Sequence, residues 1–127
     1  MKFFVLSLIA FSILLSCSKD DKSAVEEVAL SFHKKLADYD LMALKPYCTK
    51  NMQTKVEALH TQFNAMPEDK KDELRKMMKE KIGGVETVEC KIDGEKAECT
   101  PCCDKNGKPF TEKILLRKES GKWLVWD

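Results

Sequence analysis

The carboxyl-terminal third of the chain reads VETVECKIDGEKAECTPCCDKNGKPFTEKILLRKESGKWLVWD (residues 85–127), and apolar residues alternate with polar ones along much of it. A period of two is typical of β-strands that bury one face. Turn signals at Asp93-Gly94, Asn106-Gly107 and Ser120-Gly121 divide the stretch. The pattern therefore predicts four strands, over residues 85–92, 97–103, 109–118 and 122–127.

The strand register follows from the second turn signal. A two-residue turn at Asn106-Gly107 places Cys103 opposite Phe110, and the same register pairs Cys99 with Ile114 and Ala97 with Leu116. All these side chains then share one sheet face. The full set predicted to face inward is Val88, Cys90, Ile92, Ala97, Cys99, Cys103, Phe110, Ile114, Leu116, Trp123 and Val125.

The residues before this stretch have a helical period. Ser23-Ala24-Val25-Glu26 is a capping box, so a helix is expected to begin there. A short helix over residues 41–45, one capped by Thr49 and one from Pro67 to Ile82 should follow, with Gly83-Gly84 ending the last. Helices first and an antiparallel meander afterwards predict an α+β domain over residues 23–127.

The first residues form a targeting segment. A lysine and a short apolar run precede Leu14-Leu15-Ser16-Cys17, which resembles the lipobox of bacterial lipoproteins. The resemblance implies a signal peptide over residues 1–16, acylation of Cys17 and a flexible stalk over 17–22. It also implies a lipid-anchored protein of the bacterial outer membrane, and Lys19-Asp20-Asp21 resembles a tag for export to the cell surface.

The charges of the mature chain are balanced. Without residues 1–16, whose one charged side chain is Lys2, the chain has 21 basic and 21 acidic side chains. Nucleic-acid binding requires a basic face, so this balance argues against such a partner.

Three segments are similar to a known family. AVEEVALSFHKKLADYDLMALKPYCT (24–49), IDGEKAEC (92–99) and LLRKESGKWLV (115–125) resemble bacterial lipoprotein domains of the cystatin-like, nuclear-transport-factor-2-like superfamily. The members are largely of unknown function, and some have been called lumazine-binding. The resemblance implies a curved four-stranded sheet that encloses a conical cavity with the first helices. The cysteine cluster departs from the family pattern.

Three residues are candidates for that cavity: His33, Glu112 and Trp123. A histidine at the edge of a helix stripe is usually a boundary residue, and His33 has this position. Glu112 falls on the inward face opposite Pro101, where it could be a buried base or could reach water at a rim. The sequence contains no metal-ligand spacing around its histidines and no cofactor fingerprint, so neither a metal nor a cofactor is expected.

The cysteines after Cys17 are expected to form disulfides, because an extracytoplasmic compartment is oxidising. The candidates are Cys48, Cys90, Cys99 and Cys103, with Cys102 as the free or intermolecular thiol. Cys90 and Cys99 meet directly if residues 93–96 form a four-residue loop, whereas an Asp93-Gly94 turn would set Cys90 against Ala97. A redox or metal role for the cluster from Cys99 to Cys103 is the alternative.

The opposite sheet face carries Leu115, Leu124 and Trp126. Three large apolar side chains on an outer face indicate either a partner, such as a second copy in a homodimer, or cover by another segment of the chain.

These features favour a membrane-anchored module that binds an unknown small molecule or protein through the cavity or the outer sheet face. The alternatives are a small cavity enzyme of the hydrolase or isomerase type, which would use Glu112, His33 or a tyrosine, and the thiol or metal module. The sequence shows no nucleophile–base pair, which argues against the enzyme.

Overall fold

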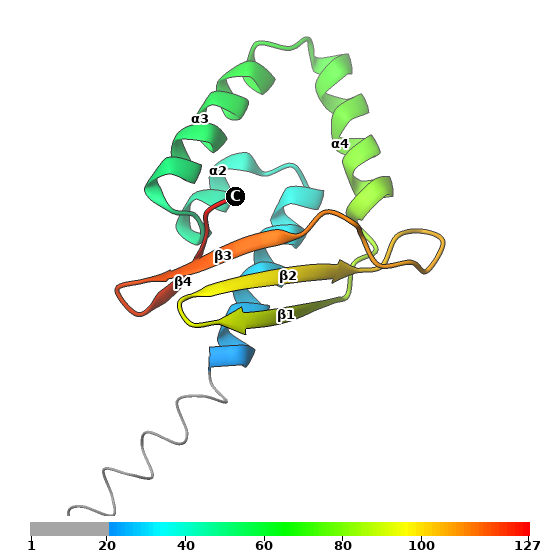
Figure 1. The fold of residues 1–127 in the computed structure, drawn as a ribbon. Helices are drawn as coiled ribbons and strands as arrows, with labels where there is room; N and C mark the ends of the chain where they lie inside the picture. Colours follow the sequence, from blue (N-terminus) through cyan, green and yellow to red (C-terminus); the bar gives the residue numbers. More distant parts are fainter. Residues whose placement is uncertain (1–20) are drawn as a thin grey trace, which may run out of the picture.

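The computed structural model describes residues 21–127, and their fold is α+β: four helices pack against a four-stranded antiparallel sheet (Figure 1). The predicted fold class is thus confirmed. The predicted signal peptide, Cys17 and most of the stalk lie outside the described residues. No helix within residues 21–127 combines the length and apolar character needed to cross a membrane.

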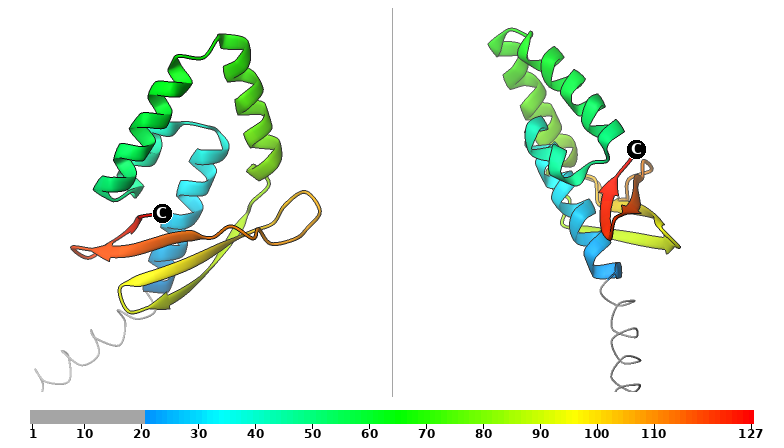
Figure 2. Two further views of the ribbon diagram at one scale, coloured as in Figure 1. Left: turned by 45° about the horizontal axis from the view of Figure 1, so that its top comes forward. Right: turned by 90° about the vertical axis from the view of Figure 1, so that its left-hand side faces the viewer.

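The first helix spans residues 21–37 of the described part and runs along one face of the sheet (Figures 1 and 2). Its start at Ser23 was predicted wrongly, because Asp21 and Lys22 are already helical and do not belong to a flexible stalk. The Asp21 carboxylate accepts a hydrogen bond from Lys118 Nζ at 2.9 Å, which ties this end of the helix to the sheet. Val25 and Ala29, which lie one turn apart on this helix, are fully buried.

The middle of the chain forms three further helices and a single 3₁₀ turn. Helix α2 spans Leu41–Leu44 and continues into the 3₁₀ helix η1, Lys45–Tyr47, which contains Pro46. Helix α3 spans Lys50–Asn64, and helix α4 spans Glu68–Ile82. The Thr49 hydroxyl accepts a hydrogen bond from the Met52 N–H at 3.3 Å, so the predicted cap is confirmed.

Helices α3 and α4 form a hairpin that rises away from the sheet (Figure 1). Helix α4 is mostly exposed, and among its residues only Ile82, at its last turn, is buried. Helix α3 buries Val56 and Phe63, so the hairpin contacts the rest of the domain through one face of α3 and through the last turn of α4.

The sheet has the order β1-β2-β3-β4. Its strands are β1 (Thr87–Asp93), β2 (Lys96–Cys102), β3 (Ile114–Glu119) and β4 (Lys122–Val125). The predicted pairs Cys99–Ile114 and Ala97–Leu116 are both present.

The second hairpin connection was predicted wrongly, because residues 109–113 are not a strand. The chain instead turns shortly after β2. The Asp104 side-chain carboxylate accepts hydrogen bonds from the N–H groups of Asn106 and Lys108, at 2.8 and 3.0 Å. These bonds hold a local turn that replaces the expected ladder. Phe110 then donates its N–H to Pro101 rather than facing Cys103, and residues 103–113 form a loop.

A hydrophobic core lies between the helices and the sheet. Every residue of its buried cluster falls between Val25 and Val125, and strand β4 closes it by pairing with Cys48 before α3. Thr49 donates its N–H to the Val125 carbonyl at 2.9 Å. Ile92, predicted inward, is 37% exposed because it lies near the end of the β1–β2 hairpin.

Candidate functional site

A cavity of about 530 Å³ lies among the first helix, the α3–α4 hairpin and the residue 103–113 loop. The first helix contributes Phe32, His33 and Leu36, and the hairpin contributes Met52, Val56, Leu59, Met78 and Lys81. The rest of the lining is Tyr39, Leu41, Leu44, Ile82, Pro101, Phe110, Thr111, Glu112, Lys113, Ile114, Val125 and Asp127. The lining is mostly apolar, and its charged members Lys81, Glu112, Lys113 and Asp127 are exposed to solvent. Such a hollow suits a molecule with a largely apolar surface.

His33 is the buried polar group of this cavity. Its side chain is only 6% exposed, so its interpretation as a boundary residue was wrong. Nε2 has no hydrogen-bond partner in the described residues. Burial lowers the pKa of His33 below its ordinary value of 6.5, and the nearby Ile82 backbone opposes this shift only in part. The imidazole is therefore neutral at neutral pH.

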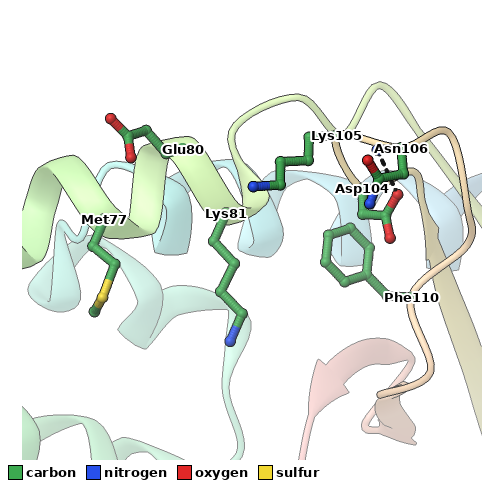
Figure 3. A pocket seen from close by; sticks show the side chains of 7 residues that line it. All are labelled: Met77, Glu80, Lys81, Asp104, Lys105, Asn106 and Phe110. Carbon is green, nitrogen blue, oxygen red and sulfur yellow. Dashed lines mark hydrogen bonds between the residues drawn. The ribbon is translucent and has the colours of Figure 1, made fainter.

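The Phe110 ring packs against the His33 ring, with centroids 5.9 Å apart and planes inclined by 55°. Phe110 also lines a second hollow of about 680 Å³ beside α4, where the Phe110 and Lys81 side chains lie between the helix and the loop (Figure 3). Phe110 and Lys81 line both hollows and thus lie at their junction. Phe110 comes from the loop rather than from a strand.

Tyr39, just after the first helix, forms part of the cavity wall. It ends the first helix with a φ of +53°, in the left-handed region that non-glycine residues rarely adopt. Its ring meets the Phe63 ring edge-on at 5.0 Å. This contact attaches the end of the first helix to α3 and fixes one wall of the cavity.

The structure places the other two cavity candidates differently. Glu112 lines the cavity but is exposed, which agrees with the rim position and not with a buried base. Trp123 is 4% exposed and belongs to the core, yet it does not line the cavity. The Lys118 ammonium lies 5.8 Å from its ring centroid, in the region where Lys118 also binds Asp21. Trp123 is therefore a core residue and not a cavity residue.

Two cysteine pairs lie within bonding distance. Cys90 and Cys99 stand directly opposite each other on β1 and β2 with Cα atoms 4.0 Å apart, and a disulfide joins them as predicted. The connecting turn is shorter than the expected four-residue loop, since Asp93 already pairs with Lys96. Cys102 and Cys103 are neighbours in the sequence and their sulfur atoms lie side by side, and the role of Cys102 as a free or intermolecular thiol stays a prediction.

Cys48, one of the predicted disulfide candidates, is buried and has no disulfide partner among the described cysteines. Its Sγ donates to the Leu44 carbonyl at 3.1 Å, and burial raises its pKa to about 11. Cys99 is fully buried in its bond with Cys90, so it cannot join Cys102 and Cys103 in a three-thiol site. No group of three or more metal-ligating side chains is present within residues 21–127.

The outer sheet face carries Leu115, Leu124 and Trp126 together, as strand alternation predicts, and all three are half-buried. The Arg117 guanidinium lies 5.9 Å from the Trp126 ring centroid and forms an ion pair with Glu119 at 2.6 Å. The cation covers part of the apolar surface, while no helix lies on this side of the sheet in the described part (Figure 2).

Comparison of the chain with protein-family models, with curated proteins and with solved structures finds no match. The cavity and its chemistry are therefore the basis for a functional assignment.

Several cavity residues were not predicted as such from the sequence. Met52, Leu59 and Met78 lie in segments that were predicted only as helices, and Pro101 was predicted only as the residue opposite Glu112. A stripe shows which helix face is apolar but not whether that face meets another element closely or leaves a gap. No feature of the sequence distinguishes Leu59 from the buried apolar residues of α3, and only the structure shows that it is 44% exposed.

Proposed function

We propose that this protein is a membrane-tethered binding module whose cavity takes a small, largely apolar molecule. The observation that carries the proposal is the 530 Å³ cavity, a volume within the usual range for small-molecule sites of roughly 300–1,000 Å³. Its lining combines many apolar side chains with one buried polar atom without a partner, and this is the usual composition of such a site.

The tether rests on the sequence around Cys17. Acylation by two or more chains would hold the domain at a membrane, whereas a single chain binds only marginally. Because the described helix begins by residue 21, only a few residues separate Cys17 from the domain. We propose that the domain works close to the bilayer surface of the outer membrane.

Binding is better supported than catalysis. Within the described residues, no hydrogen bond links the His33 ring to a carboxylate, hydroxyl or thiol, so a nucleophile–base pair is lacking. Glu112, the other candidate for acid–base chemistry, is exposed to water. The apolar interior offers contact area rather than reactive groups.

Two adjacent methionines of α4 provide the test. Met78 lines the cavity and is half-buried, whereas Met77 is 54% exposed and does not line it. The protein used is residues 17–127 with the substitution Cys17→Ser. Binding is measured by the fluorescence of N-phenyl-1-naphthylamine, a dye that brightens in apolar surroundings. Met78→Lys places a charge in the apolar lining and should weaken binding at least tenfold, because burying an unpaired charge is costly.

The control variant Met77→Lys adds the same charge one residue away and should leave dye binding unchanged. The proposal is wrong if the unsubstituted domain does not bind the dye, or if the two variants weaken binding equally.

A further inference from the structure

We propose that the cavity ligand is an anionic amphiphile, with an apolar chain in the cavity and a carboxylate beside the Lys81 ammonium. This inference rests on the proposed function and names the class of ligand. Lys81 is thereby assigned as the residue that favours an acid over a neutral molecule with the same chain.

The first step is the position of Lys81. It belongs to the last turn of α4, and it is the one charged residue that lines both the cavity and the second hollow. Its side chain extends away from α4, and its carbon chain leads to an ammonium at the edge of the apolar lining (Figure 3). A lysine in such a place covers apolar surface with its methylene groups while its charge stays in water. The cation therefore lies at the open side of an apolar space.

The second step is the lack of a partner for this cation. No ion pair joins Lys81 to a carboxylate within residues 21–127. The neighbouring Glu80 side chain points in the opposite direction (Figure 3). Carbonyls at the end of α4 are also occupied, since Lys79 accepts from the Gly83 N–H at 2.9 Å and Ile82 from the Val85 N–H at 3.4 Å. The Lys81 ammonium is therefore available to an anion.

The third step concerns the other charges of the two hollows. Glu112 and Lys105 have no ion pair among the described residues, and they lie in different hollows. Lys105 lines the second hollow together with Lys81, whereas Glu112 lines the cavity alone. The remaining charged side chains have partners: Asp104 accepts from the Asn106 and Lys108 N–H groups, Lys113 pairs with Glu98 at 3.2 Å, and Asp127 pairs with Lys55 at 3.5 Å. The acid group is therefore expected on the side of the second hollow, away from Glu112.

The fourth step is the cost of desolvation. A carboxylate placed deep among the apolar side chains would lose its water without compensation. At Lys81, which is exposed, the carboxylate keeps part of its water and gains an opposite charge. The apolar chain gains free energy from burial in the cavity. A molecule with both parts thus fits the two hollows better than a purely apolar one.

The test uses two probes that share a ten-carbon chain and differ in the head group, decanoate and 1-decanol. Displacement of N-phenyl-1-naphthylamine from residues 17–127 carrying Cys17→Ser measures their binding. Lys81→Gln should weaken decanoate binding about fivefold, the upper end of the range for an exposed ion pair, and leave 1-decanol binding unchanged. Added salt should likewise weaken the binding of decanoate only, because it screens the charges.

The matched control is Lys79→Gln. This variant removes the same charge from the same turn of α4, but Lys79 lines neither hollow and lies 3.8 Å from Asp38. It should therefore bind decanoate as the unsubstituted domain does. Lys79 and Lys81 are both exposed, so neither substitution removes a core contact.

The outcomes separate the two proposals. If the dye itself does not bind, the proposed function fails and this inference fails with it. If the dye binds but decanoate does not displace it, this inference is overturned while the binding cavity stands. The same holds if Lys81→Gln binds decanoate as tightly as before, or if Lys79→Gln weakens decanoate binding equally.

Discussion

Phe110 packs its ring on that of His33, so a loop residue and a residue of the first helix form one aromatic contact beside the cavity. Neither residue is on a strand, and 77 positions separate them in the sequence. The contact joins the part of the fold with regular structure to the loop of residues 103–113. The properties of the cavity therefore depend on both segments.

His33 should make stability depend on pH. Because its pKa is lowered in the folded state, the unfolded chain binds more protons as the pH falls below about 6.5. The stability that the neutral ring contributes is thus complete above that pH and decreases below it. Urea denaturation at pH 7.5 and pH 5 should show a larger loss of unfolding free energy for the unsubstituted domain than for His33→Phe. Equal losses would contradict the buried neutral imidazole.

The disulfide between Cys90 and Cys99 should contribute measurable stability. The loop that it closes is short, so the entropic gain lies in the lower part of the usual range, about 2–3 kcal/mol. The double variant Cys90→Ala/Cys99→Ala should lose about that amount in denaturant unfolding. Peptide mapping without reductant gives the independent check, and a fragment that links Cys90 to any cysteine other than Cys99 would refute the pairing.

The proposed lipid anchor at Cys17 predicts a change of compartment. Cys17→Ala should abolish fatty-acid labelling and release the protein from the membrane fraction, because the acyl chains would no longer be attached. Cys48→Ala is the matched control, since Cys48 is a buried thiol and should not carry lipid. Unchanged labelling of the Cys17→Ala chain would show that the lipobox interpretation is mistaken.

The outer sheet face is proposed as a homodimer contact. Full burial of a side chain such as Leu115, Leu124 or Trp126 in a contact would contribute roughly 1.5–3 kcal/mol of binding free energy. The gain at Trp126 is smaller, because Arg117 already covers part of its ring. Light scattering at tens of micromolar should therefore detect a dimer, and Trp126→Glu should convert it to a monomer.

The control for the dimer is Thr87→Glu, which adds the same charge on β1, away from the patch. This variant should remain dimeric. If the unsubstituted domain is a monomer under these conditions, Arg117 and the rest of the chain cover the patch and the dimer does not exist.

The sheet could be predicted from the sequence because each strand buries one face. Alternation excludes a shift of one residue, which would move Cys99 and Leu116 to the solvent side. The expected turn then selected the pairs Cys99–Ile114 and Ala97–Leu116, which are present although residues 103–113 form a longer loop. The helices were predictable for a similar reason, since Thr49 and Gly83 act locally as cap and stop.

The connection between β2 and β3 could not be predicted in the same way. Asn106-Gly107 is a strong hairpin signal, but the Asp104 carboxylate binds two nearby N–H groups and forms a different turn. Because of this turn, Phe110 lies in the loop beside His33 and not in the sheet ladder, where it was predicted. The cavity was missed for the same reason, because its shape depends on where that loop and the α3–α4 hairpin leave a gap.

The five methionines within residues 21–127 allow the most direct test of the proposed cavity. Met52 and Met78 line it, whereas Met42 and Met66 do not line it and are exposed. The measurement is the ¹³C-methyl NMR spectrum of methionine-labelled domain during titration with 1-naphthol. The proposed function predicts that the Met52 and Met78 signals shift together and saturate, while those of Met42 and Met66 stay in place. Shifts confined to Met42 or Met66, or no shift at any methionine, would contradict a binding site between the helices and the sheet.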